Sequence, residues 1–304
     1  MWVRAGRGTV KRMKSISAEH VRNEQRDEWS AAAPGWIQRR EQVSAPTAAI
    51  TERLLSLAGI GPGQRVLDVA CGVGDPALTI AGRVGPDGSV VGLDLNEAMV
   101  AGAREAAAAH NVSNADFRVI RSELEVPPEN FDAVTCRHGL MYMPDPMTAV
   151  VAWTRALRPG GRIAISTWGP PDTLPGFMLA MQIILRHVEL PPPDPTAPGP
   201  FAMPTEAVHR QTLEAAGLRD VSTTSFQCGL MEADTPADWW SLAEETAGPI
   251  VMLLASLPAE RRRTIRADAI ETLHARFGGG PVKLGGQAIV SVGRTAHGQG
   301  ESLR

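Results

Sequence analysis

Short runs of β-branched residues alternate with helical stretches from Gln64 onward. This alternation is typical of a parallel sheet with helices on both faces. Glycine-containing turns at residues 84–88 and 158–161 end a helix and introduce the next strand. Since parallel crossovers are right-handed, the pattern predicts a doubly wound α/β sheet. Its first five strands are expected at residues 65–69, 90–95, 116–120, 131–135 and 162–167.

The segments on either side of this region extend the prediction. Residues 221–227 and 287–292 are expected to form two further strands, with a helical insert between them from about residue 236 to residue 277. We therefore predict a seven-stranded, mostly parallel sheet with a helical insert before the last strand. The predicted divisions are a disordered basic leader at 1–16, an N-terminal helical lid at 17–63, a sheet core at 64–170, and the remainder of the same domain at 171–304.

The composition is that of a globular protein, with 43% hydrophobic and 21% charged residues in a chain of 304. The three cysteines, Cys71, Cys136 and Cys228, lie too far apart in the sequence for a disulfide framework or a zinc knuckle. We expect no metal site and a cytoplasmic location. The longest apolar stretches, such as residues 250–257, are too short to span a bilayer, so we expect a soluble protein.

Charge is distributed unevenly along the chain. Residues 1–14 contain five basic residues and no acidic one. Without those five, 25 basic residues stand against 33 acidic ones, which leaves the rest of the chain at −8. An acidic body argues against a nucleic-acid groove, because phosphate binding depends on clustered Lys and Arg. The basic segment is expected to be either a disordered leader or a tether to nucleic acid or membrane.

An apolar strand leads into a glycine-containing turn, Val66-Leu67-Asp68-Val69-Ala70-Cys71-Gly72-Val73-Gly74-Asp75. Such a turn lets the backbone approach a ligand closely at the carboxyl end of the first strand. Gly72-x-Gly74-x-x-Ala77 also satisfies the dinucleotide fingerprint. An NAD(P)-dependent oxidoreductase is therefore a rival prediction.

The charges around this turn separate the two predictions. Pro76 removes one of the N–H groups that a pyrophosphate would need, and Asp68 and Asp75 add negative charge on both sides. This favours a ligand with a cationic ammonium or sulfonium group. Asp94, 22 residues after Gly72, lies at the end of the second strand, where a carboxylate accepts hydrogen bonds from ribose hydroxyls. The alternatives are a helix-capping role for Asp75 and a turn role for Asp94.

Three successive motifs resemble those of class I S-adenosylmethionine-dependent methyltransferases. They are Asp68-x-Ala70-x-Gly72-x-Gly74, Asp94 and Leu157-Arg158-Pro159-Gly160-Gly161. The segment at residues 135–145 further resembles the branch that contains ubiquinone and menaquinone biosynthesis enzymes and related natural-product methyltransferases. The resemblance covers residues 64–168 well and the rest of the chain loosely. It implies a Rossmann-like core and S-adenosylmethionine as cofactor, with S-adenosylhomocysteine as product.

The resemblance also implies roles for individual residues. Asp94 would bind the ribose and Arg137 would line the cofactor or pair with an acceptor carboxylate. The third strand departs from the family pattern, since it ends in Arg121-Ser122-Glu123 and leaves Ser122 and Glu123 as alternatives for the adenine amine. Ala70 replaces a usual glycine, a change that the turn tolerates if this residue keeps a negative φ. The remaining implied contacts are Asp68, Ala70, Gly72 and Gly74 for the methionine portion, and Leu95 and Met99 for the adenine faces.

The acceptor side is predicted from position. His138 follows the fourth strand, and an imidazole with a pKa of about 6.5 would accept a proton near neutrality. A structural or substrate-packing role is the alternative. We predict a small apolar or ring-containing acceptor, methylated on oxygen, nitrogen or carbon, and no nucleic-acid substrate. A catalytically silent cofactor-binding module is a further rival. The candidate pocket residues are Trp29, Trp36, Met141, Tyr142 and Trp240. The alternatives are packing on the sheet for the three tryptophans and core filling for Met141.

Overall fold

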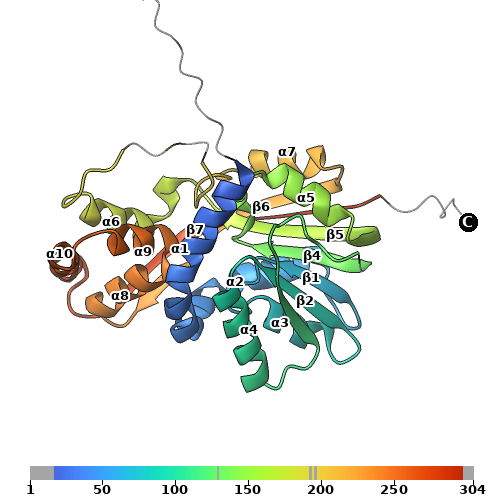
Figure 1. The fold of residues 1–304 in the computed structure, drawn as a ribbon, viewed down its shortest axis with the longest axis horizontal. Coiled ribbons are helices and arrows are strands. Elements are labelled where there is room, and N and C mark those ends of the chain that lie inside the picture. Colours follow the sequence, from blue (N-terminus) through green and yellow to red (C-terminus); the bar gives the residue numbers. More distant parts are fainter. Residues whose placement is uncertain (1–16, 129, 192–193, 195–196, 297–304) are drawn as a thin grey trace, which may run out of the picture.

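The computed structural model describes residues 17–128, 130–191, 194 and 197–296, so the leader predicted at 1–16 lies outside the described residues. A seven-stranded sheet forms the centre of the fold, in the order β3-β2-β1-β4-β5-β7-β6 (Figure 1). The first five strands are parallel, and β7 runs antiparallel between β5 and β6. The bounds are β1 Arg65–Val69, β2 Ser89–Asp94, β3 Ala115–Val119, β4 Phe131–Arg137, β5 Leu157–Trp168, β6 Arg219–Ala233 and β7 Val282–Arg294.

Helices cover both faces of this sheet, which confirms the predicted doubly wound architecture. One face is packed by α2 (Arg40–Ala58), α3 (Ala77–Val84) and α4 (Glu97–Ala109). The other face is packed by α5 (Pro146–Thr154) and α7 (Glu206–Ala215). Asp145 caps α5 by accepting the Thr148 N–H at 3.1 Å, with proline at the first helical position. No helix in the described parts of the chain is long and apolar enough to cross a membrane.

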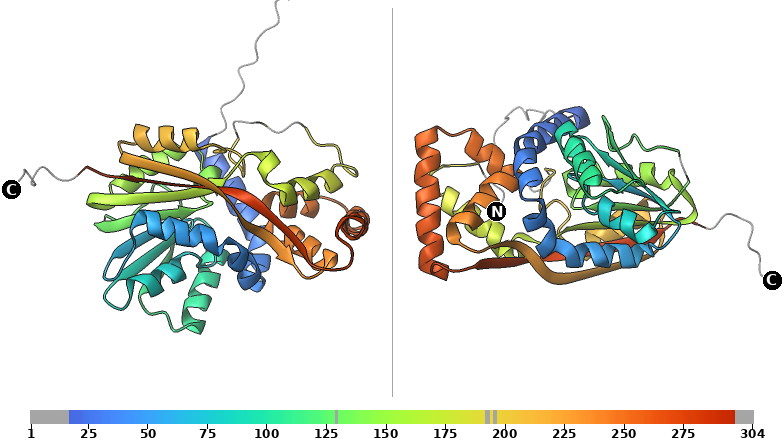
Figure 2. Two further views of the ribbon diagram at one scale, coloured as in Figure 1. Left: turned by 180° about the vertical axis from the view of Figure 1, so that it is seen from behind. Right: turned by 90° about the horizontal axis from the view of Figure 1, so that it is seen from below.

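The predicted insert forms three helices, α8 (Pro236–Thr246), α9 (Gly248–Ala255) and α10 (Ala259–Phe277). Together with α6 (Pro175–Ile184) they surround a second hydrophobic core, separate from the two cores on the faces of the sheet. The β6–β7 pair connects the two parts of the molecule. Beyond β5 it continues as a two-stranded ribbon that ends at the Ala233–Val282 pair, between the helices (Figure 2).

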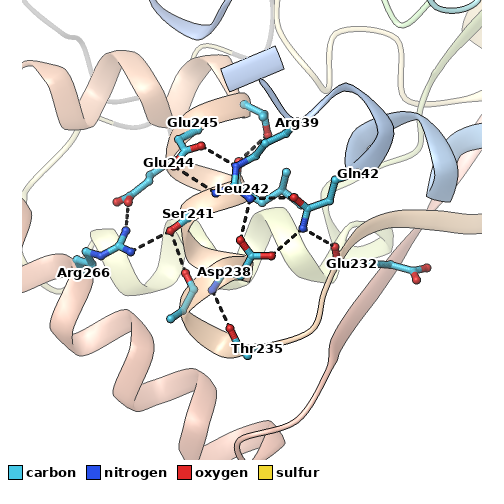
Figure 3. Close-up of polar contacts among 12 residues, drawn as sticks. Arg39, Gln42, Glu232, Thr235, Asp238, Ser241, Leu242, Glu244, Glu245 and Arg266 are labelled. Atoms are coloured by element: carbon cyan, nitrogen blue, oxygen red, sulfur yellow. Dashed lines mark hydrogen bonds and ion pairs between the residues drawn. The ribbon is translucent and has the colours of Figure 1, made fainter. Parts of the chain in front are cut away.

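Helix α1 (Ala18–Gln38) lies between the sheet and helices α8 and α9 (Figure 1). On the sheet side, Arg22 forms a bidentate ion pair with Glu123, with both N···O distances at 2.7 Å. On the helical side, the Trp36 indole N–H donates to the Thr246 carbonyl at 2.7 Å. Arg39, at the end of α1, bonds to acidic side chains of α8 (Figure 3). Within the predicted lid, therefore, α1 bridges two lobes while α2 packs on the sheet.

Two local predictions are corrected. Residues 158–161 were expected as a turn after a helix, but they lie inside β5 as an irregularity. Phe131 pairs with Leu157, whereas Ala133 pairs with Arg162, so the intervening residues of β5 bulge out of the ladder. The last two strands are also longer than the predicted 221–227 and 287–292. Their extra residues form the ribbon, which lacks a long β-branched run.

Candidate functional site

A cavity of about 250 Å³ opens at the carboxyl ends of β1, β2, β4 and β5 and extends beneath α1. The order of the sheet reverses between β1 and β4, and ligands in open α/β sheets bind at such a point. The sheet-side wall consists of the loops that follow these strands. The opposite wall comes from α1, α2, α6, β6, α8 and the start of α9.

The turn after β1 has three residues in the left-handed region: Ala70 with φ 58°, Gly72 with φ 52° and Gly74 with φ 105°. Ala70 therefore does not meet the condition of a negative φ under which alanine was expected to be tolerated here. Here the chain leaves the strand sharply, and the Cys71 N–H donates to the Leu93 carbonyl of β2 at 3.0 Å. That bond holds the turn although a Cβ in this region is strained. Ala70 and Gly72 line the cavity, and Gly74 does not.

Asp68 lies beneath the turn rather than at the cavity surface. It is fully buried, and its Oδ1 accepts a hydrogen bond from the Thr135 hydroxyl at 2.6 Å. Its Oδ2 has no partner among the described residues. Burial raises the pKa of Asp68 to about 7. The side chain therefore supports the turn from below, and contact with a ligand would pass through the backbone above it.

Asp94 lines the cavity at the end of β2. Its Oδ2 accepts the Gly72 N–H at 2.9 Å, and its Oδ1 accepts the Asn96 N–H at 2.9 Å. The second bond is the turn role given above as an alternative, so Asp94 has a structural role as well as a position on the cavity. Burial raises the pKa of Asp94, although the hydrogen bonds from backbone N–H groups lower it in part. Leu95 and Met99 line the cavity beside it.

At the end of β3 the structure distinguishes the two alternatives. Glu123 is 2% exposed and lines the cavity, with its carboxylate bound to Arg22 of α1. Ser122 does not line the cavity, and its hydroxyl accepts the Leu124 N–H at 3.2 Å instead.

Arg137, the last residue of β4, lines the cavity and is paired within the protein. Its guanidinium lies 2.8 Å from the Asp75 carboxylate and donates to the Thr51 hydroxyl at 2.9 Å. The capping role considered for Asp75 is not found, since the residue at the helix cap is Pro76. Asp75 instead balances the charge of Arg137.

His138 follows Arg137 with φ 57°, a strained value for a non-glycine residue. Its ring stacks on Trp168 with centroids 3.9 Å apart and planes 10° from parallel. Neither ring nitrogen has a partner among the described residues. Burial, followed by the charge of Arg137, lowers the pKa of His138 well below the ordinary 6.5. The sequence prediction of a group that titrates near neutrality is therefore corrected, because this imidazole is neutral at neutral pH.

Four of the five predicted pocket residues line the cavity: Trp29, Trp36, Met141 and Tyr142. Trp29 packs edge-on against Tyr142 at 5.2 Å and against Trp36 at 6.1 Å. The prediction for Trp240 is wrong. Its side chain is 0% exposed and belongs to the core among α6, α8, α9 and α10. The residues of this insert that do reach the cavity are Leu242, Thr246, Ala247, Gly248 and Pro249.

Arg40 was missed by the sequence analysis. It lines the cavity near the start of α2 and donates from Nη2 to the Gly102 carbonyl at 2.8 Å. Its Nε is buried without a partner among the described residues, and the charge of Glu105 acts on the guanidinium from a longer distance than an ion pair. Burial lowers the pKa of Arg40. A cation on an amphipathic helix has no distinctive sequence signal, so only the fold could identify it.

Within the described residues, no three His, Cys, Asp or Glu side chains are grouped so that they could hold a metal ion. The three cysteines are free thiols. The chemistry of the cavity therefore has to be derived from its organic side chains and from a bound organic ligand.

Comparison with known sequences gives a consistent result. A family described as "Methyltransferase domain" matches residues 60–189. Nocamycin O-methyltransferase of Saccharothrix syringae is 29% identical over 248 residues, which are 77% of this chain and 86% of that protein. A demethylmenaquinone methyltransferase of Listeria monocytogenes is 34% identical over 140 residues, or 44% of this chain and 56% of that protein. The chain thus spans just over half the length of the second relative.

Solved structures show the same fold at low sequence identity. The YcgJ protein of Bacillus subtilis has a TM-score of 0.53 and 20% identity, covering 83% of this chain and all of that one. Phosphoethanolamine N-methyltransferase 2 of Haemonchus contortus, solved with phosphomonomethylethanolamine and S-adenosylhomocysteine, has a TM-score of 0.55 and 17% identity. That match covers 93% of this chain and 61% of the nematode protein.

Proposed function

We propose that this chain, which belongs to the S-adenosylmethionine-dependent methyltransferase family, methylates a small, largely apolar molecule in the cavity beneath α1. The observation that carries the proposal is the position of this cavity, where the glycine turn, Asp94 and the end of β4 meet at the carboxyl edge of the sheet. When bound, S-adenosylmethionine supplies a methyl carbon that its sulfonium makes electrophilic.

We assign the ribose of the cofactor to Asp94. Each carboxylate oxygen has two acceptor positions, and each uses one for a backbone N–H group, from Gly72 or from Asn96. One position per oxygen is left for the two ribose hydroxyl groups. Leu95 and Met99 offer apolar surface to the adenine ring, and Glu123 lies at its edge, so we assign the adenine amine to Glu123. The backbone at Ala70 and Gly72 would hold the methionine portion.

Arg40 tests whether the cavity fits this cofactor. Arg40 is half-buried, and its Nε is buried without a partner, so a ligand that supplies an acceptor and a negative charge there would stabilise it. Arg40 also lies near the glycine turn, because it bonds to the Gly102 carbonyl, and Gly102 is close to Val73 of that turn. The α-carboxylate of S-adenosylmethionine is an anion of the required kind. We therefore assign this carboxylate to Arg40, and the donor set of the cavity fits the cofactor.

The acceptor would lie on the other side of the transferred methyl group. Methyl transfer to it requires alignment and exclusion of water, which the apolar residues under α1 provide. His138 lies at the end of β4, between the proposed cofactor and acceptor positions. We propose that its neutral imidazole accepts the acceptor's proton or orients the nucleophilic atom. Since α1 is bonded to both lobes, we also propose that it acts as a lid that moves when ligands exchange.

The rival functions are less well supported. The comparisons give no support to an NAD(P)-dependent oxidoreductase. Calorimetric binding of S-adenosylhomocysteine, with no binding of NAD, would exclude that rival, whereas the reverse would refute the proposed function. Methyl transfer to any acceptor, measured as S-adenosylhomocysteine release, would exclude a catalytically silent module. We further propose a reducing compartment such as the cytoplasm, which the three free thiols support.

A pair of ligands tests the residue assignments. S-adenosylhomocysteine carries the carboxylate, whereas 5′-methylthioadenosine has the same adenosine without the amino-acid portion. Arg40→Gln should weaken binding of the first about 10- to 100-fold and leave the second within about twofold. Asp94→Asn should weaken both alike, since both contain the ribose. Arg53→Gln is a matched control, because Arg53 is exposed on the same helix and does not line the cavity. Equal losses for both ligands in Arg40→Gln would refute its assignment.

A further inference from the structure

Pro34 divides helix α1 into two parts that are held differently. A proline has no N–H group, so one hydrogen bond of the helix is missing here, at the kind of position where helices bend most readily. The part after it, residues 35–38, is fixed to the helical lobe, because Arg39 at its end bonds to Glu245 at 2.6 Å (Figure 3). The longer part before it, residues 18–33, forms a flap over the cavity.

Polar contacts hold this flap against the sheet-side wall. Besides the ion pair of Arg22, Arg26 donates to the Arg121 carbonyl at 2.7 Å. Two further bonds come from one side chain after β2, since Asn96 Nδ2 donates to the Ser30 hydroxyl at 2.7 Å and to the Arg26 carbonyl at 3.1 Å. The flap is therefore attached to the same loops that surround the proposed cofactor position.

Asn96 is the residue where the flap and the proposed ribose site meet. It is 3% exposed and lines the cavity. Its backbone N–H donates to Asp94 Oδ1 at 2.9 Å, and its own Oδ1 accepts the Met99 N–H at 3.0 Å, which caps α4. Turning the amide away from the flap would also break this cap. The position of Asn96 therefore depends on Asp94 and helps to determine that of the flap.

On the opposite side, one contact of the flap disfavours the closed position. Glu28 packs against Gly248 of α9, and its buried Oε1 has no hydrogen-bond partner among the described residues. A buried carboxyl oxygen without a partner is unfavourable. The bonds to the sheet-side loops hold the flap closed against this cost, so a ligand with additional contacts to the closed flap would shift the balance further.

We propose that Asn96 is a positioning residue that couples the cofactor to the flap, so that cofactor binding closes the flap and thereby completes the acceptor pocket. The proposal rests on the methyltransferase function proposed above. The adenosine would lie between Asp94 on one side and Gln25 and Trp29 of the flap on the other, and only the closed flap offers the second set of contacts. Trp29 of the closed flap packs edge-on against Tyr142 at 5.2 Å, in the proposed acceptor wall. The cofactor therefore binds before the acceptor, and S-adenosylhomocysteine leaves after the methylated product.

Hydrogen exchange of the full chain, followed by mass spectrometry, measures closing of the flap without an acceptor. Saturating S-adenosylhomocysteine should slow exchange of the amides of residues 18–33 at least about tenfold in the wild-type protein. Saturating 5′-methylthioadenosine should do the same, because closing acts through the adenosine. Peptides of α10 are the internal reference, since this helix does not line the cavity, and their exchange should not change.

Asn96→Ser separates the two roles of the asparagine. Serine is also a good helix cap, so α4 keeps its N-terminus, but the shorter side chain does not reach the flap. Both ligands should still bind, yet they should slow flap exchange by less than about twofold, and S-adenosylhomocysteine should dissociate about tenfold faster in stopped-flow measurements. Ser30→Ala removes one of the two bonds from the flap side and should give intermediate values for both quantities. Ser56→Ala, at an exposed position of α2, is the matched control and should behave as the wild type.

Three outcomes would overturn the proposal: wild-type flap protection in Asn96→Ser, wild-type protection and dissociation in Ser30→Ala, or protection by S-adenosylhomocysteine but not by 5′-methylthioadenosine. Ser30→Ala leaves the cap of α4 untouched, so it decides the matter even where Asn96→Ser lowers the melting temperature. No binding of either ligand to the wild-type protein would instead overturn the proposed function. The two failures are therefore distinguishable.

Discussion

The two walls of the cavity are built differently. The sheet-side wall comes from the ends of strands and the loops that follow them, between Val69 and Trp168, and carries most of the charged groups. The helical wall comes from α1, α2, α6, β6, α8 and α9, which are far apart in the sequence, and is mostly apolar. The difference indicates that local motifs determine the proposed cofactor site, whereas tertiary packing determines the acceptor site. The same sheet-side wall is thus compatible with many different helical walls.

The largest expected effect is on kcat, and it comes from His138, which lies where the two walls meet. His138→Ala should lower kcat about 10²- to 10⁴-fold and leave S-adenosylhomocysteine affinity unchanged. His138→Gln retains a polar group that orients the acceptor but cannot accept the proton. Because the pKa of His138 is lowered, wild-type kcat should show no titration of this residue above pH 6.5. His274→Ala, at an exposed position on α10, is the control. Full activity in both His138 variants would assign the residue to packing.

The next effect concerns stability of the helical lobe alone. Trp240→Ala should lower the free energy of unfolding by about 3–5 kcal/mol, because it leaves a void in a fully packed core. Thermal denaturation measures this loss, and calorimetry should show unchanged S-adenosylhomocysteine affinity. A raised KM for the acceptor with an unchanged melting temperature would instead support the pocket role predicted from sequence.

Two smaller effects concern the free energy of unfolding, to which His209 of α7 and Glu28 of α1 should contribute with opposite pH dependence. His209 of α7 is buried between the Thr167 and Ser291 hydroxyls, at 2.7 and 2.8 Å, and burial lowers its pKa to about 4. The unfolded chain therefore takes up a proton first as the pH falls from 6.5 to about 4, and about 3 kcal/mol of stability is lost. Glu28 of the lid has a raised pKa, so stability is lost as the pH rises from 4.5 to about 7, by about 2 kcal/mol.

Urea unfolding across this pH range separates the two contributions. His209→Asn should flatten the acidic slope, and Glu28→Gln should flatten the loss toward pH 7. The slope is the relevant quantity, because each substitution also changes overall stability. A Glu28→Gln variant with the wild-type slope would show that α1 leaves the sheet before the protein unfolds.

The sequence predicted the sheet and most of the proposed cofactor contacts because each carries a local signal. Asp94 was located by its distance from Gly72 and its place at a strand end, and it lines the cavity. The positive φ of Ala70 could not be predicted, since a small side chain does not reveal that the chain must bend sharply there. Glu123 and Ser122 could not be separated, because the turn after β3 decides which of them faces inward.

The helical wall was less predictable for a physical reason. Trp239 and Trp240 indicate that one side of a helix is buried. The pattern of apolar residues does not show whether that side faces a protein core or a ligand cavity. In the folded chain the helix α10 packs in this region, so the side chains belong to a core. Trp29 and Trp36 were placed correctly on the cavity, because they precede the sheet in a segment that had to cover one of its edges. Arg40 had no sequence signal, since its missing partner is a property of the folded chain.

The ribbon of β6 and β7 has a consequence for how such a molecule diversifies. The last pair of the ribbon, Ala233 with Val282, brings the two ends of the intervening segment to adjacent strand positions, about 5 Å apart. Residues 234–281 are therefore an insertion between two paired strands, and both ends of the insertion are attached to the same rigid ribbon. Such a segment is exchangeable as a cassette: a substitute of another length or sequence would leave the register of the sheet and the loops after β1 and β2 unaltered, whereas the contacts between α1 and α8 would change.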